Sequence, residues 1–97
     1  MANQISVSPA ELRTRGTKFI SGGQNIDSII KSLNNEANAL QSIWKGDAQK
    51  KFDVKYKELS PKMKEFVQLV DSIGKQLKSV ADAMEKSDRD IARQISK

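Results

Sequence analysis

Acidic side chains lie close together near the C-terminal end of the chain, where Asp82 is three residues from Glu85 and Asp88 is two from Asp90. Paired carboxylates can perform acid–base catalysis when burial shifts their pKa values, or bind a metal ion where a loop gathers oxygen ligands. Here they fall on outward positions of a predicted helix, and no oxygen-rich loop accompanies them. We therefore expect ionised surface carboxylates, no catalytic residue and no metal site.

Histidine and cysteine are both absent from the 97 residues. Their absence removes the commonest general base, thiol nucleophiles, disulfides and cysteine–histidine zinc sites. No motif for a cofactor is present either. The composition therefore predicts a non-enzymatic protein.

Lysines form a second group of side chains that could bind a ligand. Lys50, Lys57, Lys64 and Lys78 share one heptad position of a predicted helix, on the side away from its core. Such a stripe could bind nucleic-acid phosphates or an anionic membrane, in keeping with the net charge of +5. Carboxylates interrupt the stripe and no aromatic residues accompany it, so we expect a solvated face and no specific nucleic acid as partner. An intracellular protein that binds nucleic acid or anionic membrane is the alternative function.

The single tryptophan, Trp44, is followed by Lys45 and Gly46. On physical grounds we expect the large aromatic side chain of Trp44 to close the end of a helical core. Gly46 would supply the left-handed backbone conformation that lets the chain reverse. We therefore place a turn at residues 44–46.

The segment before this turn predicts a long helix over residues 9–43. Ser8 is a favourable N-cap, Pro9 suits the first helical position, and Glu11 completes a capping box. Apolar residues then recur every seven positions, which places them on one face of the helix. They are Leu12, Phe19, Ile26, Leu33 and Leu40.

Glycines interrupt the otherwise helical composition of this segment. Gly16 and Gly23 begin a second row at seven-residue spacing, which continues as Ile30, Ala37 and Trp44. Because a glycine inside a helix costs roughly 0.5–1 kcal/mol relative to alanine, we expect these glycines to let a neighbouring helix approach closely. A break at Gly22 and Gly23, giving three helices, is the alternative. The unbroken spacing from Phe19 to Ile26 favours one continuous helix.

A second long helix is predicted over residues 47–95, with Gly46 or Asp47 as its cap. Two apolar rows keep seven-residue spacing along it, which indicates coiled-coil-like packing. One row is Phe52, Leu59, Phe66, Ile73 and Val80, and the other is Tyr56, Met63, Val70, Leu77, Met84 and Ile91. Pro61 must release one backbone hydrogen bond, to the carbonyl of Lys57, so we expect the helix to bend there without ending.

The apolar surface of the second helix is wider than these two core rows. Flanking positions also hold apolar or small residues, namely Val67, Gly74, Ala81, Leu69 and Ala83. One neighbouring helix cannot cover that width, so we predict an all-α fold, an antiparallel helix-turn-helix hairpin that dimerises into an elongated four-helix bundle. The residues expected at helix or dimer contacts are Gly16, Gly23, Phe66, Val70, Ile73 and Leu77.

A chain of 97 residues with two long helices and a Trp-x-Gly between them resembles the WXG family, the ESAT-like small proteins exported by type VII secretion systems. The resemblance spans essentially the whole chain. The stretches that look like the family's Gram-positive members are Ser8–Leu12, Trp44–Gly46, Phe52 and Glu58–Lys62. It implies a single helical domain over residues 1–97 and a secreted, virulence-associated effector, adaptor or co-secretion factor.

The family carries a second export element near its C-terminus, an aromatic residue followed four positions later by Asp or Glu. The matching register here holds Met84 and Asp88, so the acidic position is kept and the aromatic position is not. The second helix is expected to extend beyond the start of the first, so that Asp88 lies on a projecting tail. In an antiparallel dimer that tail would lie beside the Trp44 turn of the partner chain.

Further expectations concern partners and location. The resemblance implies that the type VII export ATPase recognises the protein in the cytoplasm. The dimer partner is expected to be a second copy, a related small helical protein, or the helical N-terminal region of a toxin. Residues 1–7 lack a basic segment followed by an apolar run, so we expect secretion without a cleavable signal peptide.

Overall fold

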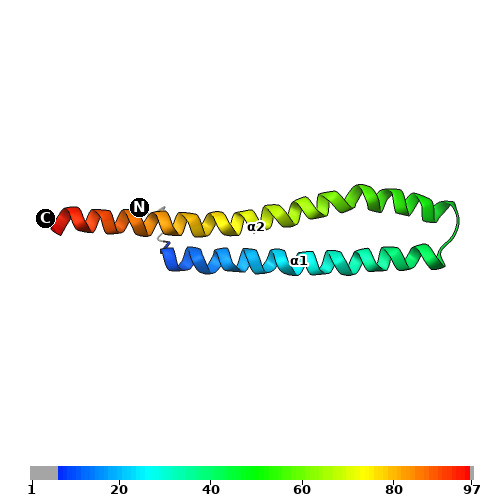
Figure 1. Ribbon diagram of the computed structural model, residues 1–97, viewed down its shortest axis with the longest axis horizontal. Helices are drawn as coiled ribbons and strands as arrows, with labels where there is room; N and C mark the ends of the chain where they lie inside the picture. Colours follow the sequence, from blue (N-terminus) through cyan, green and yellow to red (C-terminus); the bar gives the residue numbers. More distant parts are fainter. Residues whose placement is uncertain (1–6, 97) are drawn as a thin grey trace, which may run out of the picture.

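Two long antiparallel helices make up the computed structural model, which describes residues 7–96 (Figure 1). Helix α1 spans Pro9–Ile43 and helix α2 spans Asp47–Ser96, and a short turn joins them. The molecule measures 77 × 26 × 15 Å, so it is a thin rod. The predicted all-α hairpin is confirmed. The expectation about a signal peptide falls on residues 1–7, all but the last of which lie outside the described residues.

Helix α1 begins with the expected cap and continues without interruption. The backbone N–H of Glu11 donates to Ser8 Oγ at 3.1 Å, and Pro9 occupies the first turn, where its missing N–H costs nothing. The helix passes through Gly22 and Gly23, so residues 7–96 form two helices and not three.

Helix α2 also continues through its one proline. Pro61 lies inside the 50-residue helix. Figure 1 shows α2 curving in its green, turn-proximal portion while remaining helical. A helix that loses one hydrogen bond can bend in this way, because the bonds on either side of the gap are kept.

Small residues form the centre of the contact between the helices. The residues classed as buried are Gly16, Gly23, Ala37, Gly74 and Ala81. A Cβ atom added at Gly16 would lie 2.7 Å from the carbonyl oxygen of Gly74, and one added at Gly74 would lie 2.6 Å from the carbonyl oxygen of Gly16. The two backbones therefore touch at this level, which is possible only because neither residue has a side chain.

The contact surface of α2 is centred differently from the expectation based on its apolar rows. Gly74 and Ala81, expected to flank the core, lie at its centre. The row that runs from Phe52 to Val80 lies to one side instead, and Phe66 in its middle is 54% exposed. The physical reason is the close approach of the backbones, because large side chains do not fit between helices at that distance.

One broad side of the hairpin is consequently apolar and uncovered. We call this side the apolar face and define it by one row of residues from each helix. The two rows meet across shallow hollows that residues of both helices line. It comprises Phe19, Ile26, Leu33 and Leu40 from α1, and Leu59, Phe66, Ile73 and Val80 from α2. Five of the eight side chains are between 42% and 54% exposed.

Candidate functional site

The turn between the helices is shaped by Trp44 and Gly46. Trp44 is the C-cap of α1, with an extended backbone, and its N–H donates to the carbonyl oxygen of Leu40 at 2.8 Å. Gly46 has a φ of +114°, a conformation that residues with a side chain rarely adopt. Its carbonyl oxygen accepts the N–H of Lys50 at 3.2 Å, which forms the first bond of the next helix. Tryptophan thus ends one helix, and glycine allows the reversal.

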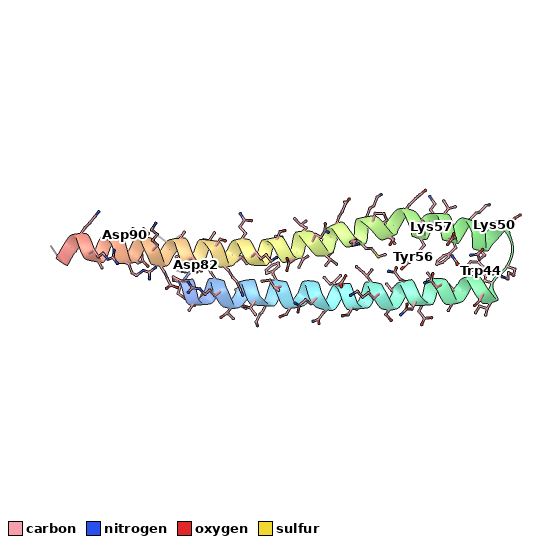
Figure 2. All side chains as sticks on the ribbon, viewed as in Figure 1. Trp44, Lys50, Tyr56, Lys57, Asp82 and Asp90 are labelled. Carbon is pink, nitrogen blue, oxygen red and sulfur yellow. The ribbon has the colours of Figure 1, made fainter. Side chains whose placement is uncertain are left out.

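A row of aromatic rings closes this end of the hairpin. The ring centroid of Trp44 lies 5.7 Å from that of Phe52, which lies 5.9 Å from that of Tyr56 in a stacked arrangement. The Tyr56 hydroxyl donates to Asn34 Oδ1 on the other helix. Figure 2 shows Trp44 and Tyr56 at the turn end of the rod. Trp44 is half-buried by these neighbours, which leaves part of its ring accessible to a binding partner.

Polar side chains complete the turn. Gln41 Nε2 donates to Asp53 Oδ1 at 2.7 Å, and Lys57 Nζ lies 2.9 Å from Asp53 Oδ2. The hydrogen bonds from Lys57 and then Gln41 hold the pKa of the Asp53 carboxyl below its ordinary value. Lys45 Nζ donates to the carbonyl oxygen of Gln41 at 3.2 Å. Lys45 therefore satisfies a carbonyl in the last turn of α1, which gives the middle residue of Trp-Lys-Gly a local structural role.

The projecting tail lies at the opposite end of the rod. Figure 2 shows Asp82 level with the beginning of α1, and Asp90 beyond it. Met84 is half-buried and Asp88 is exposed. Within one chain, the Trp44 turn and the tail are therefore separated by nearly the whole length of the molecule.

An ion-pair cluster fastens the base of this tail to α1. Arg13 Nη2 donates to Asp82 Oδ1 at 2.7 Å, and Arg13 also pairs with Glu85. These two carboxylates raise the pKa of Arg13 above its ordinary value. The carboxylates that the sequence places three residues apart thus bind an arginine from the other helix. Among residues 7–96 no group of three or more acidic or metal-ligating side chains could hold a metal ion.

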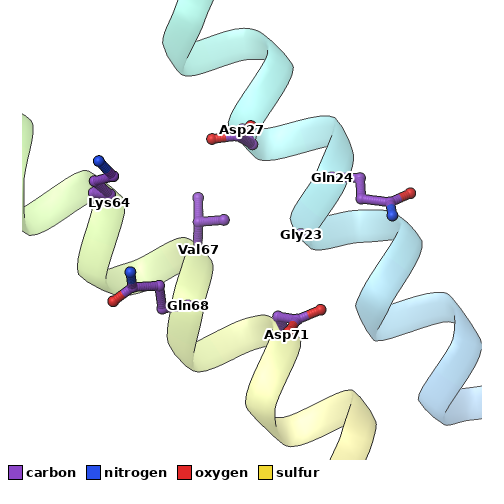
Figure 3. A pocket seen from close by; sticks show the side chains of 7 residues that line it. All are labelled: Gly23, Gln24, Asp27, Lys64, Val67, Gln68 and Asp71. Atoms are coloured by element: carbon purple, nitrogen blue, oxygen red, sulfur yellow. The ribbon is translucent and has the colours of Figure 1, made fainter.

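The side of the hairpin opposite the apolar face is polar. A groove there is lined by Gly23, Gln24, Asp27, Lys64, Val67, Gln68 and Asp71 (Figure 3). Its two carboxylates each pair with a lysine one turn further along the same helix, at 3.1 Å for Asp27 and 2.9 Å for Asp71. Such exposed pairs are typical of a solvated helix surface. The predicted lysine stripe is likewise exposed at Lys50, Lys57 and Lys64, and Lys57 also pairs with Asp53.

The residues predicted at the turn and at helix or dimer contacts lie in different environments. Trp44, Lys45 and Gly46 form the turn, and Gly16 and Gly23 face α2 of the same chain. Among the expected contact residues on α2, Phe66 is exposed on the apolar face, and Val70, Ile73 and Leu77 are half-buried. The bonds of Asn34 and Gln41 across the hairpin were not anticipated, because no local pattern pairs a residue of one helix with a residue of the other.

The fold and the turn together define an ESAT-like helical hairpin. A solved structure of EsxA from Geobacillus thermodenitrificans superposes with a TM-score of 0.83 at 32% identity, covering 95% of this chain and 99% of that one. The secreted protein EsxB of Bacillus anthracis superposes with a TM-score of 0.77 at 26% identity, covering 88% and 97%. Within the part of the chain that the structure describes, no helix is long and apolar enough to span a membrane.

Sequence comparison places the chain in a family. Residues 4–89 match the family model WXG100, proteins of 100 residues with WXG. The chain is 40% identical over 93 residues to ESAT-6-like protein SAG1039 of Streptococcus agalactiae, covering 96% of this chain and 97% of that protein. It is 32% identical over 88 residues to type VII secretion system extracellular protein A of Staphylococcus aureus, covering 91% of each. The chain belongs to the WXG100 family, and the predicted resemblance is confirmed.

Proposed function

We propose that this protein is a substrate of a type VII secretion system and acts outside the cell through helical protein–protein contacts, as an effector, adaptor or co-secretion factor. The observation that supports this most is the Trp44–Gly46 turn, built as the closed end of a two-helix hairpin in a WXG100 chain. The similarity to an extracellular type VII protein of Staphylococcus aureus supports the same function. The hairpin contributes a recognition surface and catalyses no reaction.

The working form is a homodimer. Among residues 7–95, Ala37 and Ala81 are the only apolar side chains that the single hairpin buries fully enough to form a core. Small chains with so little buried surface are marginal by themselves, because burial must offset the entropy of ordering the chain. A second copy packed on the apolar face would bury both of its rows and form a four-helix bundle. A related small helical protein or the helical N-terminal region of a toxin would use the same face.

The dimer also assembles the export signal. Trp44 lies at the closed end of the rod and Asp88 on the tail at the open end. An antiparallel arrangement brings the turn of one chain beside the tail of the other. The export ATPase would then read Trp44 and Gly46 from one chain together with Met84 and Asp88 from its partner.

A complementation experiment tests this composite signal. Trp44→Ala and Asp88→Ala chains, each expressed alone, are expected to remain in the cell, because every composite signal then lacks one half. When the two chains are expressed together, a mixed dimer holds one intact signal, made by the turn of the Asp88→Ala chain and the tail of the Trp44→Ala chain. Both chains should then appear in the culture medium, as measured by immunoblotting with distinguishable tags.

Asp90→Ala is the matched control, because Asp90 is an exposed acidic residue two positions from Asp88. That variant should be exported alone at the unmodified level. Continued retention of both chains after co-expression, with mixed dimers verified by co-purification from the cells, would show that the two elements must lie on one chain. Export of the Asp88→Ala chain by itself would exclude Asp88 from the signal.

A further inference from the structure

Gly22 is unlike the other glycines within the helices. Gly16, Gly23 and Gly74 each face the neighbouring helix of the same chain, whereas a Cβ added at Gly22 would meet no atom within 4 Å. A glycine in the middle of α1 costs roughly 0.5–1 kcal/mol relative to alanine. No close contact within the hairpin therefore requires a glycine at this position.

Gly22 instead lies in a hollow of the apolar face. The hollow is almost entirely apolar and is lined by Lys18, Phe19, Gly22, Ile26 and Val70. Phe19 precedes the glycine and Ile26 follows it, so two large side chains flank a position that has none. A second helix laid over this point could approach the backbone of α1 closely.

The size of the apolar face fits a second copy of the chain as the occupant. The 35 residues of α1 extend for about 50 Å at 1.5 Å per residue, and two adjacent helices are about 20 Å wide. The resulting face of roughly 1,000 Å² exceeds the ~800 Å² that each partner buries in a typical stable complex. A small ligand would cover only a small part of it.

Two copies can lay their apolar faces together about a two-fold axis in either of two directions. An axis along the rod is parallel: it places α1 of one copy over α2 of the other, and each tail projects past the end of the helix that it would face. An axis across the rod is antiparallel: it places α1 over α1 and α2 over α2, so each tail lies along the turn-proximal part of the other α2.

The apolar side of the tail favours the antiparallel arrangement. Ile91 lies about five helical turns beyond Ile73, which places both residues on the same side of α2. Ile91 is 52% exposed in the hairpin, because α1 begins too late to cover it. The α2 helix of an antiparallel copy covers this side chain, and a parallel copy leaves it in water.

The length of α2 then determines where the axis crosses the rod. Two antiparallel α2 helices overlap along their whole length when the axis passes through their middle, at Asp71 and Ser72. Val70 adjoins this point and lines the same hollow as Gly22, so Gly22 lies at almost the same level on α1. A residue on a two-fold axis meets its own copy. The two α1 helices therefore meet at Gly22.

We propose that the homodimer is antiparallel and that its two α1 helices make their closest contact at Gly22, on the two-fold axis. This inference rests on the homodimer proposed above. Phe19 of each copy packs against Ile26 of the other, on either side of the glycine contact. The glycine lowers the helix propensity of the single chain and allows the close approach of two chains.

The same register also positions the two halves of the export signal. Asp88 and Phe52 lie equally far from Val70 in opposite directions along α2. With the axis at this level, Asp88 of one copy faces Phe52 of the other, whose ring centroid lies 5.7 Å from that of Trp44. The contact at Gly22 thus sets the register in which the turn and the tail come together.

Single cysteines locate the axis, because the chain has no cysteine of its own. A disulfide requires Cα atoms within about 7 Å, so under mild oxidation most of a Gly22→Cys protein should become a covalent dimer. Ile29→Cys is the matched control, an exposed position one heptad further on the same side of α1. Its two copies lie about 20 Å apart and should not cross-link. Non-reducing electrophoresis measures both products.

A pair of variants tests the same axis with Gly22 in place. Arg15 and Ile29 lie equally far from Gly22 in opposite directions. A mixture of Arg15→Cys and Ile29→Cys chains should therefore cross-link, whereas neither should do so alone. Cross-linking of Ile29→Cys to itself would overturn the register. Cross-linking of Gly22→Cys to an Ile73→Cys chain and not to itself would indicate the parallel arrangement and overturn the proposal as well.

Gly22→Leu tests the glycine itself, with dimer dissociation measured by sedimentation over a range of protein concentrations. Two leucines would collide on the axis, so the dissociation constant should rise roughly tenfold or more. Ser21→Leu is the control, an exposed neighbour outside the hollow, and should leave the constant within about twofold.

The unmodified chain separates failure of this contact from failure of the homodimer. If that chain is a dimer while Gly22→Cys stays uncross-linked or Gly22→Leu keeps full affinity, the contact at Gly22 is wrong and the homodimer stands. If the unmodified chain sediments as a monomer at all concentrations, the homodimer is wrong too.

Discussion

Gly74→Ala is expected to destabilise the hairpin although alanine is the better helix former. The new methyl group would lie 2.6 Å from the carbonyl oxygen of Gly16 and 2.7 Å from Cγ1 of Ile20, so the helices must separate. Overpacking of this kind costs about 1–3 kcal/mol, more than the gain of up to ~1 kcal/mol in helix propensity. A net loss of 1 kcal/mol lowers the melting temperature of a domain of this size by ~4–8 °C. Thermal and urea unfolding by circular dichroism, at one fixed protein concentration, measure the change.

The reciprocal glycine provides an internal check on this prediction. Gly16→Ala should have a similar effect, because its methyl group would lie 2.7 Å from the carbonyl oxygen of Gly74. The double variant should lose less than the sum of the two, since one substitution already separates the helices. Ser72→Ala, an exposed position on α2, is the control and should leave stability equal or slightly higher. A Gly74→Ala protein at least as stable as the unmodified one would contradict the close backbone contact.

Trp44→Ala is expected to reduce export sharply while leaving the two helices formed. The Trp44 ring is half-buried beside Phe52, so part of it is available to the export machinery. Loss of an aromatic anchor from a recognition surface commonly costs ~2 kcal/mol or more, which corresponds to a roughly 30-fold or greater loss of binding. The amount of protein in the medium should fall accordingly, as measured by quantitative immunoblotting of cells and medium.

Ile43→Ala is the matched control for this variant. Ile43 precedes Trp44 and is 79% exposed, yet it contributes nothing to the aromatic row. Its removal should leave export unchanged. A Trp44→Ala protein that accumulates in the cell at normal levels, retains helix and dimer, and still reaches the medium normally would remove Trp44 from the signal. A fall in both cell and medium would instead show that Trp44 acts through stability.

The helices themselves could be predicted from the sequence because their determinants are local. The Ser8 cap and seven-residue apolar spacing act within a few turns, and the structure has the expected hairpin. The centre of the contact on α2 could not be placed, since the spacing is the same for every row. Hydrophobicity favoured the row containing Phe66, whereas the approach of Gly16 to Gly74 selected the row of small residues.

The turn shows the same division between local and distant determinants. The chain reversal at Gly46 could be predicted, because a glycine directly after a helix commonly ends it. Its φ of +114° is a conformation that glycine adopts readily. The hydrogen bonds and ion pairs between the two helices could not be predicted, because each joins residues on different helices. Arg13 and Asp82 are 69 positions apart, and Gln41 and Asp53 meet only after the chain has reversed. Those pairs depend on side-chain geometry, which the spacing of residues along one helix does not determine.

Export itself is tested most directly by comparing the unmodified protein in host cells with an active and with an inactivated type VII ATPase. The protein should appear in the medium only when the ATPase is active, while a cytoplasmic marker stays inside the cells in both cases. Equal amounts in the medium of both strains would contradict the proposed function. So would retention in both strains together with tight duplex binding that survives moderate salt, since that behaviour would make the protein an intracellular nucleic-acid-binding protein.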